Sequence, residues 1–185
     1  MTGTLLVLGA SADQLFMIET ARAMGLHVVA IDRNPDSPGF ARANESAVVS
    51  TRDVPALVEL ADSLRAKGHR LLGVTTMGSD IPDVVAALAA HLGTPGPSTE
   101  SARLATDKYA MKCRFRERGI PIPWFERIER AAELHAAVAA RGLPLVLKPL
   151  DSSGSRGVFL LEPGCDLDAL FARSIAYSRI GACLV

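Results

Sequence analysis

Cysteine is scarce in this sequence, and its three residues follow no pattern. Cys113, Cys165 and Cys183 share no short spacing, and no histidine stands near any of them in the 185 residues. An odd and widely spread set of thiols excludes a disulfide framework and argues against a cysteine-based zinc site. We therefore expect reduced thiols, which are typical of a cytoplasmic protein.

An excess of charge of one sign and long apolar runs are also missing. Twenty basic residues balance twenty acidic ones, and no basic tract or aromatic-interleaved basic patch is present, which argues against nucleic acid as a partner. No apolar stretch reaches the roughly 18 residues that a membrane-spanning helix needs. The N-terminus leads directly into an apolar segment and lacks the charged start of a signal peptide. We expect neither a nucleic-acid nor a membrane partner.

The first half of the sequence alternates short apolar runs with amphipathic segments. Hydrophobic residues make up 49% of the chain, enough for a sizeable core. The pattern predicts buried strands at 4–9, 27–31, 47–50 and 71–75 and helices at 13–24, 54–67 and 79–91. Strands that alternate with helices form a parallel, doubly wound sheet, so we predict an α/β, Rossmann-like domain.

Ligands of such sheets bind beyond the carboxyl ends of the strands. Small or polar residues mark these ends here, namely Gly9, Asp32, Gly78 and Ser79. We predict that these strand-end turns help to hold a substrate or pack against a second domain.

A dinucleotide site is the alternative for this edge of the sheet. The first turn, Gly9-Ala-Ser-Ala-Asp-Gln14, has one of the three glycines of the G-x-G-x-x-G fingerprint. Side chains at Ser11 and Gln14 obstruct the close backbone approach that a pyrophosphate needs. Asp32 stands where a ribose-binding carboxylate would lie, but it can equally begin a turn. An NAD(P)-binding oxidoreductase is therefore kept as the disfavoured alternative.

The amino-acid composition changes in the middle of the sequence. Residues 92–97 are dense in glycine and proline, a composition typical of a loop between units. We predict a domain boundary near Pro95, with domains at 1–95 and 96–185. After it, Ser98 and Asp107 are expected to cap two helices, followed by a strand at 124–128 and a helix at 131–141.

The strongest chemical signal is a lysine at the end of an apolar strand. Lys148 closes the run 143–148, and a second apolar run covers 157–161. A lysine that emerges from a buried strand is costly unless an anion pairs with it. The loop between the runs offers hydroxyls, flexible turns and a second cation, from Ser152, Ser153, Gly154, Ser155, Arg156 and Gly157.

Converging backbone amides, hydroxyls and cations are what a phosphate chain requires. The loop is not of the Walker type, since no G-K-[ST] follows it and it leads into a strand. The alternative is a surface hairpin with a flexible loop, whose lysine reaches out to solvent. Because Lys148 directly precedes the loop and Arg156 lies within it, we favour phosphate binding.

An ordered set of motifs resembles the ATP-grasp superfamily. The set comprises Thr106-Asp-Lys108 at the start of a helix, Gly119-Ile-Pro-Ile-Pro123, Val146-Leu-Lys-Pro149 and Asp151-Ser-Ser-Gly-Ser-Arg-Gly157. The resemblance is closest to the carboxylate–amine ligase and carbamoyl-phosphate-synthetase-like branch, with biotin carboxylase more distant. It implies that the α/β domain is followed by the first α+β part of an ATP-grasp domain.

The resemblance also implies a chemistry. ATP would lie between two α+β subdomains, with Lys108 and Lys148 on its phosphates and the loop 152–157 closing over them. The implied activity is an ATP-dependent ligase with Mg²⁺, which activates a small-molecule carboxylate as an acylphosphate for attack by an amine. Phosphoryl transfer depends on positioning and charge neutralisation more than on a protein nucleophile. A non-catalytic nucleotide-binding domain is the third alternative.

Parts of such a site are expected outside these residues. The resemblance places the adenine-binding hinge and the Mg²⁺ carboxylates after Val185, so we expect no catalytic residue and no metal ligand within the chain. We therefore expect the N-terminal part of a longer enzyme, with no ligase activity and weak ATP affinity by itself. An unpaired sheet edge and an uncovered hairpin face predict self-association, as in a homodimer.

Overall fold

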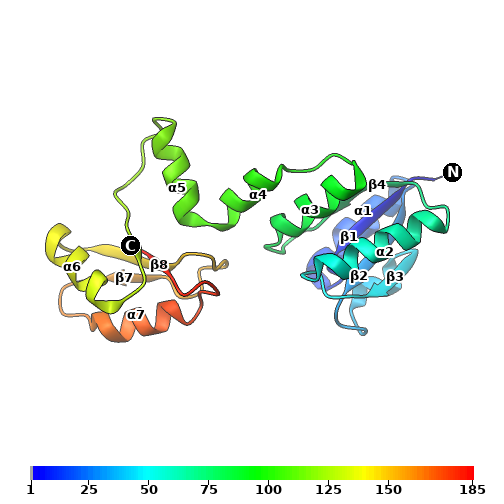
Figure 1. The fold of residues 1–185 in the computed structure, drawn as a ribbon. Coiled ribbons are helices and arrows are strands. Elements are labelled where there is room, and N and C mark those ends of the chain that lie inside the picture. The colour runs from blue at the N-terminus through cyan, green and yellow to red at the C-terminus, as the bar shows by residue number, and fades with distance from the viewer. Residues whose placement is uncertain (1) are drawn as a thin grey trace. The chain divides into compact units, whose positions relative to one another are not determined.

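A computed structural model describes residues 2–185 of the chain (Figure 1). The chain forms two compact units, Met1–Arg103 and Leu104–Val185. The predicted boundary near Pro95 lies in the loop before α4 (Thr99–Thr106), and the first unit continues through Arg103. None of the helices in the described range combines the length and the apolar character needed to cross a membrane.

The first unit is built on the predicted parallel sheet. Its order is β3-β2-β1-β4, and every pair is parallel. The strands are β1 (Thr4–Leu8), β2 (His27–Asp32), β3 (Glu45–Val48) and β4 (Leu71–Thr75). The helical elements are η1 (Ala12–Gln14), α1 (Leu15–Ala23), η2 (Pro38–Arg42), α2 (Val54–Ala66) and α3 (Pro82–Leu92).

Apolar layers cover both faces of this sheet. Leu6 and Leu8 of β1 pack with Leu57 of α2 on one face, while Val7 packs with Ile18 of α1 on the other. Burial on both faces explains why β1 reads as one continuous apolar run. The helix predicted from residue 79 begins at Pro82, because a proline is readily accommodated in the first turn and residues 76–81 form the preceding loop.

The second unit is an antiparallel sheet with helices on one face. The sheet order is β5-β8-β6-β7. The elements are α5 (Lys108–Glu117), β5 (Arg127–Ile128), α6 (Ala131–Arg141), β6 (Leu145–Pro149), β7 (Phe159–Leu161), α7 (Leu167–Ile175) and β8 (Cys183–Leu184). Residues of α6 and α7 pack with Leu147 and Leu161 in one core. The opposite face leaves Val146 and Leu160 exposed, at 45% and 56%.

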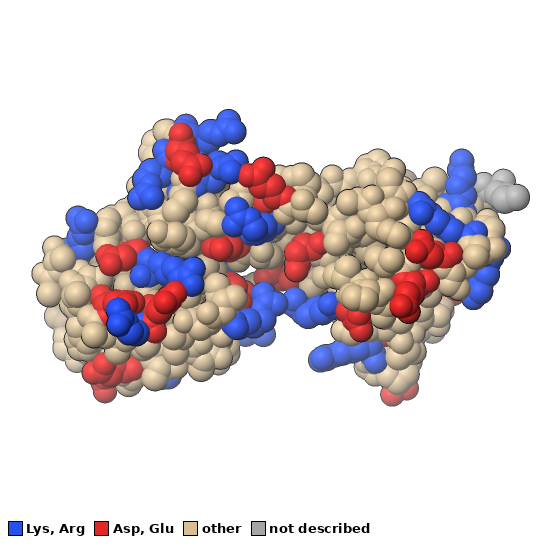
Figure 2. All heavy atoms as spheres, in the orientation of Figure 1, with Lys and Arg blue, Asp and Glu red and all other residues tan. Residues whose placement is uncertain are grey.

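Two predicted strands are shorter than expected. The strand predicted at 124–128 is confined to Arg127–Ile128, and the strand predicted from residue 157 begins at Phe159. Gly157 has φ +73°, a conformation outside the extended region, so pairing cannot begin there. Figure 2 shows acidic and basic side chains on the visible face of each unit.

Candidate functional site

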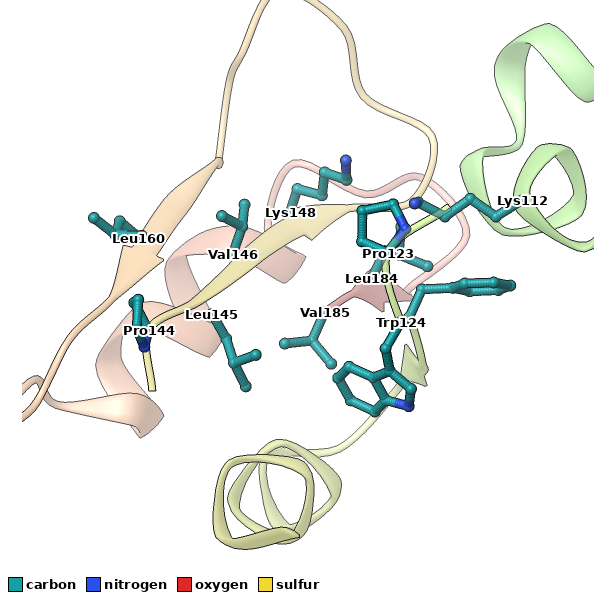
Figure 3. Close-up of a pocket in the computed structure, with 11 residues that line it drawn as sticks. Lys112, Pro123, Trp124, Pro144, Leu145, Val146, Lys148, Leu160, Leu184 and Val185 are labelled. Atoms are coloured by element: carbon teal, nitrogen blue, oxygen red, sulfur yellow. The ribbon is translucent and has the colours of Figure 1, made fainter. Parts of the chain in front are cut away.

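An apolar pocket of about 460 Å³ opens on the uncovered face of the second unit. Lys148 and Val146 lie on the same face of β6 because side chains alternate along a strand. Leu184 of β8 and Leu160 of β7 extend this wall, and Trp124 lies across from Val185 (Figure 3). The pocket therefore has an apolar floor with a lysine at its edge.

A second lysine reaches the same pocket. Lys112 projects from α5 and lies toward the end of the pocket where the Lys148 ammonium is found (Figure 3). Burial lowers the pKa of Lys112, and the positive charge of Lys148 lowers it further. No Asp or Glu side chain lines this pocket within residues 2–185. Two cations at the edge of an apolar pocket are arranged to receive an anion.

Aromatic contacts hold α5 beside the pocket. The ring of Phe125 packs edge-on against Tyr109, with centroids 5.6 Å apart. The Lys112 ammonium and the Arg116 guanidinium lie 5.4 and 5.1 Å from the Phe125 centroid. Such cation–π contacts favour the observed side of the helix for both cations. Sequence reasoning missed Lys112, although its position four residues after Lys108 puts both on one helix face.

The loop after Lys148 has the strained backbone of a tight turn. Gly154 and Gly157 have φ of +65° and +73°, and Ser155 between them has φ +56°. Ser155 is the sole non-glycine residue with positive φ in the described range, a conformation that costs about 1–2 kcal/mol. Gly157 is also sterically required, since a Cβ there would lie 2.8 Å from atoms of both Pro149 and Tyr177.

A buried carboxylate anchors the base of this loop. Asp151 is 8% exposed and accepts hydrogen bonds from Ser178 Oγ at 2.7 Å and from the backbone N–H of Arg179. The Arg179 Nε also donates to it, at 3.1 Å. Burial raises the pKa of Asp151, but the hydrogen bonds from Ser178 and Arg179 outweigh burial and hold that pKa below its usual value. These hydrogen bonds therefore fix the position of Asp151, the residue from which the loop starts.

Lys108 holds the same loop from α5. Asp107 caps the helix by accepting from the N–H groups of Tyr109 and Ala110. The Lys108 ammonium donates to the backbone carbonyls of Leu150, at 3.3 Å, and of Ser152. Lys108 is thus brought to the loop as predicted by the motif order, and its role as a phosphate ligand stays a prediction.

Removing the Lys108 ammonium should loosen the loop. Lys108→Met deletes the contacts to the Leu150 and Ser152 carbonyls, so we expect trypsin to cut after the exposed Arg156 several-fold faster. Mass spectrometry of the fragments over time measures this rate. Lys112→Met is the matched control, because it removes a lysine one helical turn away. Equal cleavage rates in Lys108→Met and the unaltered chain would contradict the anchoring role.

The predicted residues of the first unit gather at the carboxyl ends of the parallel strands. Both carboxylate oxygens of Asp32 accept backbone N–H groups, from Ala10 at 2.8 Å and from Asn34 at 3.0 Å. The buried Gln14 donates to the Met77 carbonyl, and its side chain lies beside Gly9. Asp32 and Gln14 therefore tie together the turns that follow the strands.

Gly78 and Ser79 stand in the loop after β4, at the same edge. A Cβ built on Gly78 would lie 3.5 Å from Asp13 and 3.7 Å from Gln14. Gly78 is exposed and Ser79 is half-buried. The structure thus brings Gly9, Asp32 and Gly78 to one edge, and their role in substrate binding stays a prediction.

This chain spans less than half the length of each of the following relatives. No family model matches it. An uncharacterized protein of Sinorhizobium fredii is 31% identical over 152 residues, which are 81% of this chain and 32% of that protein. The formate-dependent phosphoribosylglycinamide formyltransferase of Burkholderia mallei is 28% identical over 177 residues, which are 95% of this chain and 43% of that enzyme.

A solved structure shows the same fold from end to end. The biotin carboxylase domain of 2-oxoglutarate carboxylase from Hydrogenobacter thermophilus, a dimer in complex with MgADP and bicarbonate, covers all of this chain with a TM-score of 0.78 and 19% identity. This chain covers 44% of that domain. The chain is similar to ATP-grasp ligases. It corresponds to the N-terminal part of ATP-grasp ligases, and the predicted fold class is confirmed.

Proposed function

We propose that this chain binds the phosphates of ATP as part of an ATP-dependent carboxylate–amine ligase. Such an enzyme activates a small-molecule carboxylate as an acylphosphate, which an amine then attacks. One observation carries the proposal: Lys148 and Lys112 meet at an apolar pocket that has no Asp or Glu side chain in its lining within residues 2–185, beside a loop of hydroxyls and glycines. The kinship with the formyltransferase supports the ligase chemistry.

The residues present fit the phosphates of a nucleotide. The ammonium groups of Lys148 and Lys112 neutralise phosphate charge, and the Lys108 contacts hold the loop within reach. The open wall formed by Val146, Leu160 and Leu184 suits the apolar face of a base. In this arrangement the loop 152–157 folds over the outer phosphates and excludes water from them.

Magnesium fits this pocket less well than ATP does. Mg²⁺ prefers oxygen ligands, and the pocket lining within residues 2–185 has no Asp or Glu side chain. The biotin carboxylase domain of similar fold carries MgADP. We therefore propose that Mg²⁺ accompanies the nucleotide and takes its protein ligands from residues outside this pocket. When bound, Mg²⁺ neutralises the charge on the phosphate oxygens.

The acceptor substrates are proposed for the strand ends of the first unit. Gly9, Asp32, Gly78 and Ser79 stand at the edge where parallel sheets bind ligands. A small carboxylate and an amine are the substrate classes that follow from the ligase proposal. A homodimer and a cytoplasmic location stay predictions; the fold neighbour was solved as a dimer.

Nucleotide selectivity tests the proposal. Trp124 lines the pocket and is the sole tryptophan of the chain, so its fluorescence reports occupancy without a label. We expect ATP and ADP to change this fluorescence saturably, and AMP to bind at least tenfold more weakly because it lacks the outer phosphates that the lysines contact. NADH should leave it unchanged.

Two results of this titration would contradict the proposal. Equal affinities for AMP and ATP would mean that the lysines do not select phosphates. An NADH affinity that falls in Asp32→Ala would favour the oxidoreductase alternative. A separate assay of ADP formation distinguishes the non-catalytic alternative. A longer protein that contains this chain would then bind ATP but form no ADP when substrates are added.

A further inference from the structure

Two histidines and a glutamate meet at the amino ends of the strands in the first unit. His27 is the first residue of β2, Glu45 is the first of β3, and His69 comes two residues before β4. One ligand atom from each lies within 4.8 Å of the other two. Because all strands run in the same direction, this cluster lies at the end of the sheet opposite to Gly9 and Asp32, which stand at the carboxyl ends of their strands. The ATP-grasp function leaves it unused.

The spacing of the three side chains suits a small cation. Glu45 Oε1 lies 2.8 Å from His27 Nε2 and 3.5 Å from His69 Nε2. In a tetrahedral zinc site with bonds of about 2.0–2.1 Å, neighbouring donor atoms lie about 3.3 Å apart. The two imidazole rings are tilted by 59° with centroids 5.3 Å apart, so they converge without stacking. Small side-chain movements would bring all three donors onto one ion.

A buried hydroxyl orients the more enclosed histidine. Thr4, the first residue of β1, is 2% exposed, and its Oγ1 lies 3.3 Å from His69 Nδ1. When Nδ1–H donates to this oxygen, the lone pair of His69 is on Nε2, which is the nitrogen that faces Glu45. A partner that fixes the outer nitrogen is the usual support of a metal-binding histidine. The His69 side chain is 16% exposed, which restricts its ring further.

We propose that His27, Glu45 and His69 bind one Zn²⁺ ion. Two imidazole nitrogens and one carboxylate oxygen suit zinc, whereas Mg²⁺ and Ca²⁺ prefer oxygen donors throughout. His27 and His69 line a depression of about 260 Å³ that Lys67 and Arg70 also line, which gives room for water or a small anion as a fourth ligand.

The position of the site gives it a structural consequence. Glu45 is on β3, the edge strand, and His27 is on its neighbour β2. His69 precedes β4, on the far side of β1. One ion would therefore cross-link segments that the chain brings together from three separate strands, and it would stabilise the folded sheet over the unfolded chain.

Calorimetric titration of the metal-free chain with Zn²⁺ tests the proposal. We expect one equivalent to bind, and the unfolding temperature to rise with Zn²⁺ concentration but not with Mg²⁺. His27→Ala, Glu45→Gln and His69→Ala should each weaken binding at least tenfold. His91→Ala is the matched control, because His91 pairs with Asp62 at 2.8 Å in the same unit and lies outside the cluster.

The outcomes separate this site from other zinc ligands. Circular dichroism without metal checks that each variant folds, and Glu45→Gln keeps the test valid if a histidine variant does not. Co²⁺ in place of Zn²⁺ should give no thiolate charge-transfer absorption, because the three cysteines lie outside the cluster. Absence of binding, equal affinity in Glu45→Gln and the unaltered chain, or a thiolate band from Co²⁺ would each overturn the proposal.

Discussion

Lys148→Met should remove most of the ATP affinity of this chain and leave its fold intact. The Lys148 ammonium stands at the edge of the apolar pocket, and no Asp or Glu side chain in the lining of that pocket within residues 2–185 competes for it. Hydrogen bonds to charged groups contribute about 1.5–3 kcal/mol, so we expect a loss of roughly 10- to 150-fold in affinity. Fluorescence of Trp124 during ATP titration measures it.

Two further lysine variants show whether position or charge decides this loss. Lys67→Met removes an exposed lysine of the first unit, outside the pocket, and should bind ATP as the unaltered chain does. Lys112→Met should also lose ATP affinity, because the Lys112 ammonium lies at the same end of the pocket as that of Lys148. If Lys67→Met loses as much as Lys148→Met, the effect comes from net charge and the pocket is not the phosphate site.

The parallel sheet could be predicted from local pattern alone. Burial on both faces makes β1 and β2 continuous apolar runs, and α2 ends at Ala66, one residue before the predicted end. The same holds for Lys148 and the glycines of its loop, because the positive φ of Gly154 and Gly157 is a local requirement. These features depend on residues that are close in sequence, so the sequence pattern is enough to predict them.

The pocket and its supports depend on neighbours in space. Trp124 and Val185 face one another although they are far apart in the sequence. Asp151 meets Arg179 through a bond that no spacing rule predicts. The histidine cluster was missed for the same reason, since parallel pairing brings the starts of separate strands together.

Asp151→Ala should destabilise the second unit more than any surface substitution there. It leaves the Ser178 hydroxyl and the Arg179 amide without their acceptor, at a cost of about 1–3 kcal/mol. Unfolding in urea, followed by Trp124 fluorescence, measures the second unit because Trp124 lies in it. Asp168→Ala is the matched control, since its carboxylate pairs with His135 at the exposed surface and should change stability little.

The dependence of the unfolding free energy on acidic pH should show that the Asp151 carboxylate causes this stabilisation. Hydrogen bonds from Ser178 and Arg179 hold the folded-state pKa of Asp151 below its usual value, so its stabilisation is complete above the unfolded pKa of about 3.9. That stabilisation is lost as pH falls from there through the lower folded pKa. Asp151→Asn should therefore unfold at a urea concentration that varies less with pH below about 4 than in the unaltered chain. Parallel curves for the two proteins across that range would mean that Asp151 is held by packing, and that the loop beside Lys148 is not anchored by charge.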